Sequence, residues 1–219
     1  MATRRTSSEA ATLEQYRVAF ENVEKQPEIA TVMTEFGYGP ETVAEGKAML
    51  GATRQAYETN KTEDDETSEA YNLFETKKEE LAEIYSTDRK KAKVVFRNDP
   101  LTLERLGISG AMPRTYVRWL ETVKTFYSEA LADETIKNKL ARLRVTADGL
   151  NAANTLIGEL ESARAGYLRE KGESQEATKT KDAAFSQLDD WMRDFYDVAR
   201  IALDEKPQLL EALGLLVRS

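Results

Sequence analysis

The sequence contains no histidine and no cysteine. These absences exclude imidazole bases, cysteine nucleophiles, Cys/His zinc sites and the Glu-x-x-His iron sites of ferritin-like bundles. Catalysis would have to use carboxylates, lysine, tyrosine or serine, and none of these stands in a recognised catalytic arrangement. We therefore expect that the protein is not an enzyme, and that it has no cofactor and no bound metal.

Glycine, proline and long hydrophobic runs are also scarce. Only 11 glycines and 5 prolines interrupt the 219 residues. No apolar run approaches the ~20 residues needed to span a bilayer, and the first eight residues lead into Glu9-Ala-Ala rather than into a signal-peptide hydrophobic stretch. We expect no membrane association and a cytoplasmic location.

What the sequence does contain is typical of an all-α fold. Charged residues make up 32% of the chain and hydrophobic residues 41%, and Ala, Glu, Leu, Lys and Arg dominate. The net charge of −8 argues against binding to a phosphate backbone, so we expect no nucleic-acid partner.

The chain also repeats itself. Pro100-Leu-Thr-Leu-Glu-Arg-Leu-Gly107 returns 107 residues later as Pro207-Gln-Leu-Leu-Glu-Ala-Leu-Gly214. Near the start of each copy, Tyr16 aligns with Tyr116 at a displacement of 100, whereas residues 50–92 match residues 160–202 at a constant displacement of 110. We interpret this as a tandem duplication, with a flexible arm at 1–11, a first helical repeat at 12–110 and a second at 111–219.

Both copies contain a strongly polar segment, at residues 60–69 and 169–182. One interpretation is a hairpin tip, and the other is the solvated part of one unbroken helix. The unbroken helix is favoured, because the segments hold few turn residues and show no length change. Apolar spacing also continues across the gap, since Ile157 and Phe185 are 28 residues apart, as are Leu160 and Leu188.

An unbroken helix of this length needs partners to bury its apolar ends. The resulting expectation is two four-helix bundles linked by two long antiparallel helices. In that arrangement the apolar end of the first long helix, with Leu81 and Tyr85, meets the apolar start of the second, with Leu150 and Leu160. The hairpin alternative predicts two separate compact bundles in tandem.

The segment Phe36-Gly-Tyr-Gly-Pro-Glu-Thr-Val-Ala-Glu-Gly46, together with the two proline motifs, resembles a family of uncharacterised bacterial proteins made of two tandem helical copies. The resemblance implies the fold and the duplication, and the family has no assigned activity. The second copy departs from the pattern, because it has Leu143-Arg-Val-Thr-Ala-Asp-Gly149 in place of the Gly-Pro turn.

Two arginines are the only candidate site residues. Arg54 and Arg164 match at the displacement of 110, and each falls on an apolar face, so each is expected inside its bundle, paired with a carboxylate or stacked on a ring. Their alternative role is to bind an anionic ligand. The aromatic residues at helical spacing are expected in the core; they are Tyr16, Phe20, Tyr57, Tyr85, Trp119, Phe126, Trp191 and Phe195.

These observations favour a non-enzymatic helical scaffold or adaptor that acts through protein–protein contacts with an unknown partner. The alternative is a helical-bundle module that binds a small anionic or aromatic ligand. The apolar C-terminal segment from Leu209 either caps its bundle or makes a homodimer contact.

Overall fold

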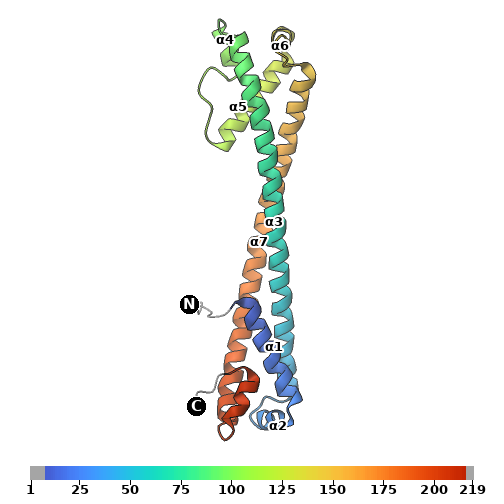
Figure 1. Ribbon diagram of the computed structural model, residues 1–219, viewed down its shortest axis with the longest axis vertical. Helices are drawn as coiled ribbons and strands as arrows, with labels where there is room; N and C mark the ends of the chain where they lie inside the picture. The colour runs from blue at the N-terminus through green and yellow to red at the C-terminus, as the bar shows by residue number, and fades with distance from the viewer. Residues whose placement is uncertain (1–7, 216–219) are drawn as a thin grey trace. The chain divides into compact units, whose positions relative to one another are not determined.

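The computed structural model describes residues 8–215, and its regular elements in this range are all helices (Figure 1). The all-α prediction is confirmed. The elements are α1 (Glu9–Lys25), α2 (Pro27–Glu35), α3 (Pro40–Val95), α4 (Pro100–Arg105), α5 (Tyr116–Ala132), α6 (Glu134–Ala141), α7 (Ala147–Ala202) and the 3-10 helix η1 (Pro207–Leu213).

Helix α1 begins earlier than the sequence suggested. The hydroxyl of Ser8 accepts a hydrogen bond of 3.2 Å from the amide of Ala11 and so caps the helix. Residues 9–11, expected in the flexible arm, are therefore the first turn of α1. The remainder of the predicted arm, residues 1–7, lies outside the described residues.

The two polar segments are helical throughout. Both α3 and α7 contain 56 residues, and they run without a break through residues 60–69 and 169–182. The continuous helix was the correct interpretation and the hairpin tip was wrong. Neither segment contains proline, and each contains at most one glycine, so nothing in it forces the chain out of the helix.

The chain forms two compact units. Of the described residues, unit 1 contains 8–64 and 173–215, and unit 2 contains 65–172. Each unit therefore takes segments of both long helices, together with α1, α2 and η1 in unit 1 or α4, α5 and α6 in unit 2. The compact units thus do not coincide with the sequence copies 12–110 and 111–219, because each unit combines elements from both copies.

Within each unit the segments of α3 and α7 run antiparallel. Contacts that ascend along α3 descend along α7. In unit 1 they join Thr53 to Ala184, Asn60 to Thr178 and Asp64 to Ser174; in unit 2 they join Tyr71 to Tyr167 and Lys77 to Glu159.

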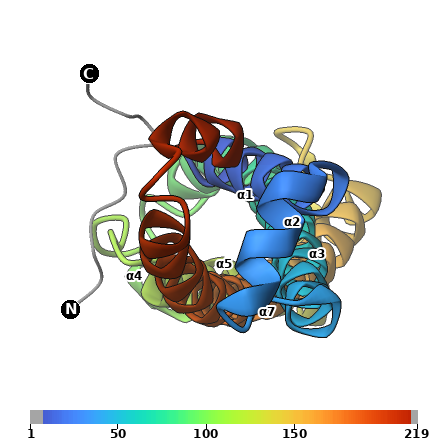
Figure 2. The same ribbon diagram turned by 90° about the horizontal axis from the view of Figure 1, so that it is seen from below.

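Each unit has its own hydrophobic core, in which the short helices cover one face of the long pair. In unit 1, α1 lies along α3 and α7, and α2 and η1 lie beside α1 (Figure 2). In unit 2, α5 takes the place of α1 (Figure 1). Core side chains include Leu13, Phe20, Ile29, Met33, Leu188 and Phe195 in unit 1, and Leu81, Tyr85, Leu120, Phe126, Leu150 and Leu160 in unit 2.

The aromatic residues expected in the core divide between two burial classes. Four are buried and four are half-buried. The buried ones are Phe20, Tyr85, Phe126 and Phe195, and the half-buried ones are Tyr16, Tyr57, Trp119 and Trp191.

The structural repeat has one register, and it differs from the sequence alignment. The starts of α1 and α5, of α3 and α7, and of α4 and η1 are each 107 residues apart, as are the ends of α3 and α7. Buried positions follow the same displacement, for example Ile29 with Ile136 and Leu81 with Leu188. The displacements of 100 and 110 were therefore wrong for these helices.

The error has a simple physical origin. A displacement of 100 differs from 107 by seven residues, which is two helical turns, and 110 differs by three, which is close to one turn. Either shift leaves apolar residues aligned with apolar residues on the same helical face. Amphipathic periodicity therefore cannot distinguish these registers, whereas helix boundaries can.

Helix C-termini repeat at 107 as well. Gly107 and Gly214 both have left-handed backbones, with φ of +67° and +79°. The residue that follows each donates its amide to the carbonyl five residues earlier, as the Schellman motif requires. Gly37 ends α2 with φ of +89°, and its equivalent Arg144 takes φ of +61° without being a glycine. The second copy therefore keeps the turn that its sequence seemed to have lost.

Candidate functional site

Arg164 stacks on an aromatic ring in unit 2. The guanidinium carbon of this half-buried side chain lies 4.2 Å from the ring centroid of Tyr116. Tyr116 itself packs edge-on against Phe74, with 5.5 Å between their centroids. The predicted ring contact is confirmed for Arg164, and it anchors the start of α5 to α7 by a cation–π interaction.

Arg54 does not occupy an equivalent place. Its side chain is exposed, so the expectation that it lies inside its bundle was wrong. In the register of 107 residues its equivalent is Glu161, and the equivalent of Arg164 is Tyr57. The match between the two arginines resulted from the displaced alignment.

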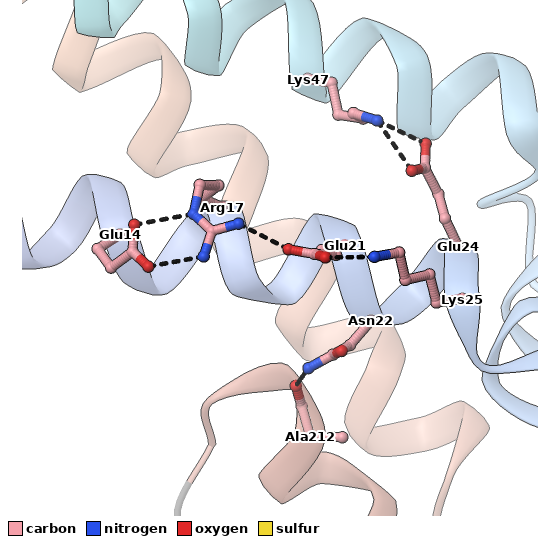
Figure 3. A network of polar contacts seen from close by, with 8 residues as sticks. All are labelled: Glu14, Arg17, Glu21, Asn22, Glu24, Lys25, Lys47 and Ala212. Carbon is pink, nitrogen blue, oxygen red and sulfur yellow. Dashed lines mark hydrogen bonds and ion pairs between the residues drawn. The ribbon is translucent and has the colours of Figure 1, made fainter.

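Arg54 lines a groove of about 350 Å³ between α1 and α3 of unit 1. The other lining residues are Arg17, Phe20, Glu21, Glu24, Lys47, Leu50 and Gly51. The charges in this wall largely neutralise one another. Arg17 donates to Glu14 at 2.7 and 2.9 Å and to Glu21 at 2.6 Å, and Lys47 donates to Glu24 at 2.8 Å (Figure 3).

These ion pairs shift the titration of their carboxylates. The hydrogen bond from Arg17 lowers the pKa of Glu14, and the bond from Lys25 lowers that of Glu21. All of these groups are solvent-exposed, so each pair stabilises the fold only weakly. The same face also fixes η1, because the amide of Asn22 donates to the carbonyl of Ala212 at 2.6 Å (Figure 3). The network therefore joins elements and leaves Arg54 outside its ion pairs.

A larger groove lies between α3 and α7 of unit 2, with a volume of about 750 Å³. It is lined by Ala70, Leu73, Lys77, Gly158, Glu159, Ser162, Ala163, Gly166, Arg169 and Glu170. We call it the glycine groove. Its charged side chains are paired, Lys77 with Glu159 at 2.6 Å and Arg169 with Glu170 at 2.5 Å. The hydrogen bond from Glu159 raises the pKa of Lys77, which keeps its charge.

The glycines of this groove have no role in the packing of the described residues. A Cβ at Gly158 or at Gly166 meets nothing within 4 Å, and neither residue has a positive φ. A glycine inside a helix costs about 1 kcal/mol relative to alanine. The helix itself does not require Gly166, because Thr59 occupies the equivalent position in α3.

Gly46 shows the contrasting case. A Cβ there lies 2.6 Å from the Trp191 ring and 2.7 Å from the Phe20 ring, so internal packing does require that glycine. The sequence analysis missed the glycine groove, although a signal was present. Gly158, Ser162 and Gly166 recur every four residues in a segment that is otherwise rich in good helix formers.

A buried polar pair in unit 2 was also missed. Asp88 is buried and accepts a hydrogen bond of 3.2 Å from the Tyr127 hydroxyl. Burial raises the pKa of Asp88, and it raises the pKa of Tyr127 as well. Because both groups are enclosed by the core, the pair holds α5 against α3 and offers no open reactive site.

Comparison with known proteins gave no match. No family model matches the chain, and no curated protein and no solved structure matches it either. The resemblance to two-copy bacterial proteins stays a prediction. Within residues 8–215, no helix combines the length and apolar character that crossing a membrane requires.

Proposed function

We propose that this protein is a non-enzymatic helical scaffold or adaptor of the cytoplasm, which binds a helix of a partner protein in the glycine groove of unit 2. The observation that carries the proposal is the pair of helical glycines, Gly158 and Gly166, which face open space in a groove of about 750 Å³. Their cost to helix stability is offset where a second backbone must approach closely.

The composition of the groove favours an amphipathic helix as the partner. Leu73 on α3 is 52% exposed and offers an apolar wall. The charged rims are already paired, so they contribute no strong field that would select an ion. Small residues every four positions on α7 leave a shallow track along its axis, and an incoming helix can lay its apolar face there.

Filling the groove tests the proposal. Gly166→Leu places a side chain in the space that the partner helix would occupy. Gly172→Leu is the matched control, because Gly172 lies on the same helix, a Cβ there also meets nothing within 4 Å, and it does not line the groove. The measurement is cross-linking of each tagged protein in its native host, followed by mass spectrometry of the captured partners.

We expect a partner that cross-links to residues around the groove in the wild type and in Gly172→Leu and is lost from Gly166→Leu. Circular dichroism controls for folding, and both variants should retain the helical content of the wild type. An identical set of partners for all three proteins, or no partner at all, would contradict the proposal.

A module for a small anionic ligand is the second candidate. The observation that favours it is the exposed guanidinium of Arg54 in the wall of a groove of about 350 Å³, where the neighbouring cations are paired with carboxylates. A thermal-shift screen with organic anions tests it, since stabilisation by a true ligand should disappear in Arg54→Ala.

A further inference from the structure

A third groove, of about 770 Å³, lies between α2 and the segment that joins α7 to η1 in unit 1. Two large apolar side chains in its lining are exposed to solvent. Phe36 is 47% exposed and Ile201 is 66% exposed. Their surroundings are acidic, because Glu28, Glu35, Asp204 and Glu205 also line the groove, with Lys206 as the one cation. We call this surface the acidic docking surface.

Unit 2 carries an equivalent surface. The residues 107 positions away from Phe36 and Ile201 are Leu143 and Val94, and both are exposed, at 37% and 59%. The ammonium of Lys139 lies 5.6 Å from the ring centroid of Phe96, which holds α6 against the end of α3. Exposed apolar side chains thus recur at the same two positions of the fold.

The charges at these equivalent positions are reversed. Glu35 corresponds to Arg142, and Asp204 corresponds to Arg97. All four of these side chains are exposed, and none of them takes part in an ion pair within residues 8–215. We call the second surface, which consists of Leu143, Val94, Arg142, Arg97 and Lys139, the basic docking surface.

We propose that copies of this chain associate head-to-tail, with the acidic docking surface of one copy on the basic docking surface of the next. The apolar pairs Phe36 with Ile201 and Leu143 with Val94 form the centre of the contact. The carboxylates of Glu35 and Asp204 face guanidinium groups across its rim. A second copy is the occupant that the page supplies, because each surface finds its complement in charge on the other unit of the same chain.

The arrangement of the contact follows general rules for interfaces. An apolar centre with a charged rim is the usual composition of a specific association surface. Rim charges mainly set partner choice and association rate, and salt screens them. Because the two surfaces differ, the contact is heterologous, and it generates rings or open chains of copies rather than a closed twofold dimer.

Charge reversal tests the proposal with the full chain. The first variant is Glu35→Arg with Asp204→Arg, which makes both docking surfaces basic. The second is Arg97→Glu with Arg142→Glu, which makes both surfaces acidic. Sedimentation velocity over a concentration series, at low and high salt, measures self-association of the wild type, of each variant and of their mixture.

We expect the wild type to assemble with rising concentration, and less so at high salt. Each variant alone should associate roughly tenfold or more weakly, because attractive rim contacts become repulsive. The equimolar mixture should regain assembly, since each surface then meets a complementary one. Ile201→Ser should also weaken assembly, whereas Val117→Ser, which removes an equally exposed apolar group elsewhere in unit 2, should leave it unchanged.

A wild type that stays monomeric at its highest soluble concentration overturns the proposal. A mixture that fails to assemble overturns it as well, and it does so even if each variant alone is monomeric. This inference goes beyond the proposed adaptor role and does not depend on the glycine groove. Gly166→Leu should assemble like the wild type, so the two proposals fail in separate experiments.

Discussion

Two glycines of one helix should respond to the same substitution with opposite signs. Gly46 and Gly51 both lie within α3 in unit 1, five residues apart. Replacing either with alanine removes the entropic cost of a helical glycine, which is a gain of about 1 kcal/mol. The packing around each position then decides the net change in the free energy of unfolding.

At Gly51 a Cβ meets nothing within 4 Å, so the full gain is retained and Gly51→Ala should stabilise the protein by about 1 kcal/mol. At Gly46 a Cβ lies 2.6 Å from Trp191 and 2.7 Å from Phe20. The rings have little room to move, since Phe20 is fully buried and Trp191 stacks on Phe195 at 5.5 Å. Overpacking of this kind costs about 2 kcal/mol, so Gly46→Ala should be destabilised by about 1 kcal/mol.

Urea denaturation measures both effects. A Trp119→Phe background leaves Trp191, in unit 1, as the sole tryptophan of a chain that has two, so its fluorescence reports the unit that carries both glycines. If both substitutions shift the transition midpoint in the same direction and by the same amount, the packing argument is refuted.

The second half of the chain supplies a rescue experiment. The equivalents of Gly46 and Trp191 are Ala153 and Ile84, so a methyl group is present there opposite a smaller side chain. Trp191→Ile should therefore cost less in the Gly46→Ala background than in the wild type. Circular dichroism follows this cycle, because the double variant lacks the reporting tryptophan.

Two further substitutions follow from the structure. Because burial raises the pKa of Asp88 above its ordinary value of 3.8, the folded state binds this proton more tightly than the unfolded state, and stability falls as pH rises through the raised pKa. Asp88→Asn keeps an acceptor for Tyr127 and should stabilise unit 2 by about 1 kcal/mol at neutral pH, with a smaller gain in acid; denaturation at several pH values checks this, and a pH-independent gain would be inconsistent with a buried charge. Arg144 has φ of +61°, so Arg144→Gly should raise the melting temperature by relieving about 1 kcal/mol of backbone strain, and an unchanged melting temperature would show that the strain is absent.

The short helices and their boundaries were well predicted from residue chemistry. Pro27 and Pro40 begin α2 and α3 because proline is favoured in a first turn, and Gly37 ends α2 because its backbone is left-handed. Continuity of the long helices could also be predicted, since the polar segments lack breakers. The burial of Arg54 was predicted wrongly, because periodicity identifies a helical face but not how far along that face the covering helices extend.

The sequence by itself determined that this protein is all helical and that its two halves repeat, because helix capping, helix propensity and apolar spacing are local properties of the chain. Only the tertiary structure decided the register of the repeat, because shifts of one or two helical turns preserve the same apolar face. That register in turn paired Glu35 with Arg142 and Asp204 with Arg97 as equivalent positions of opposite charge. The tertiary structure also left Gly158 and Gly166 facing open space, because packing against other elements decides which helical faces remain uncovered.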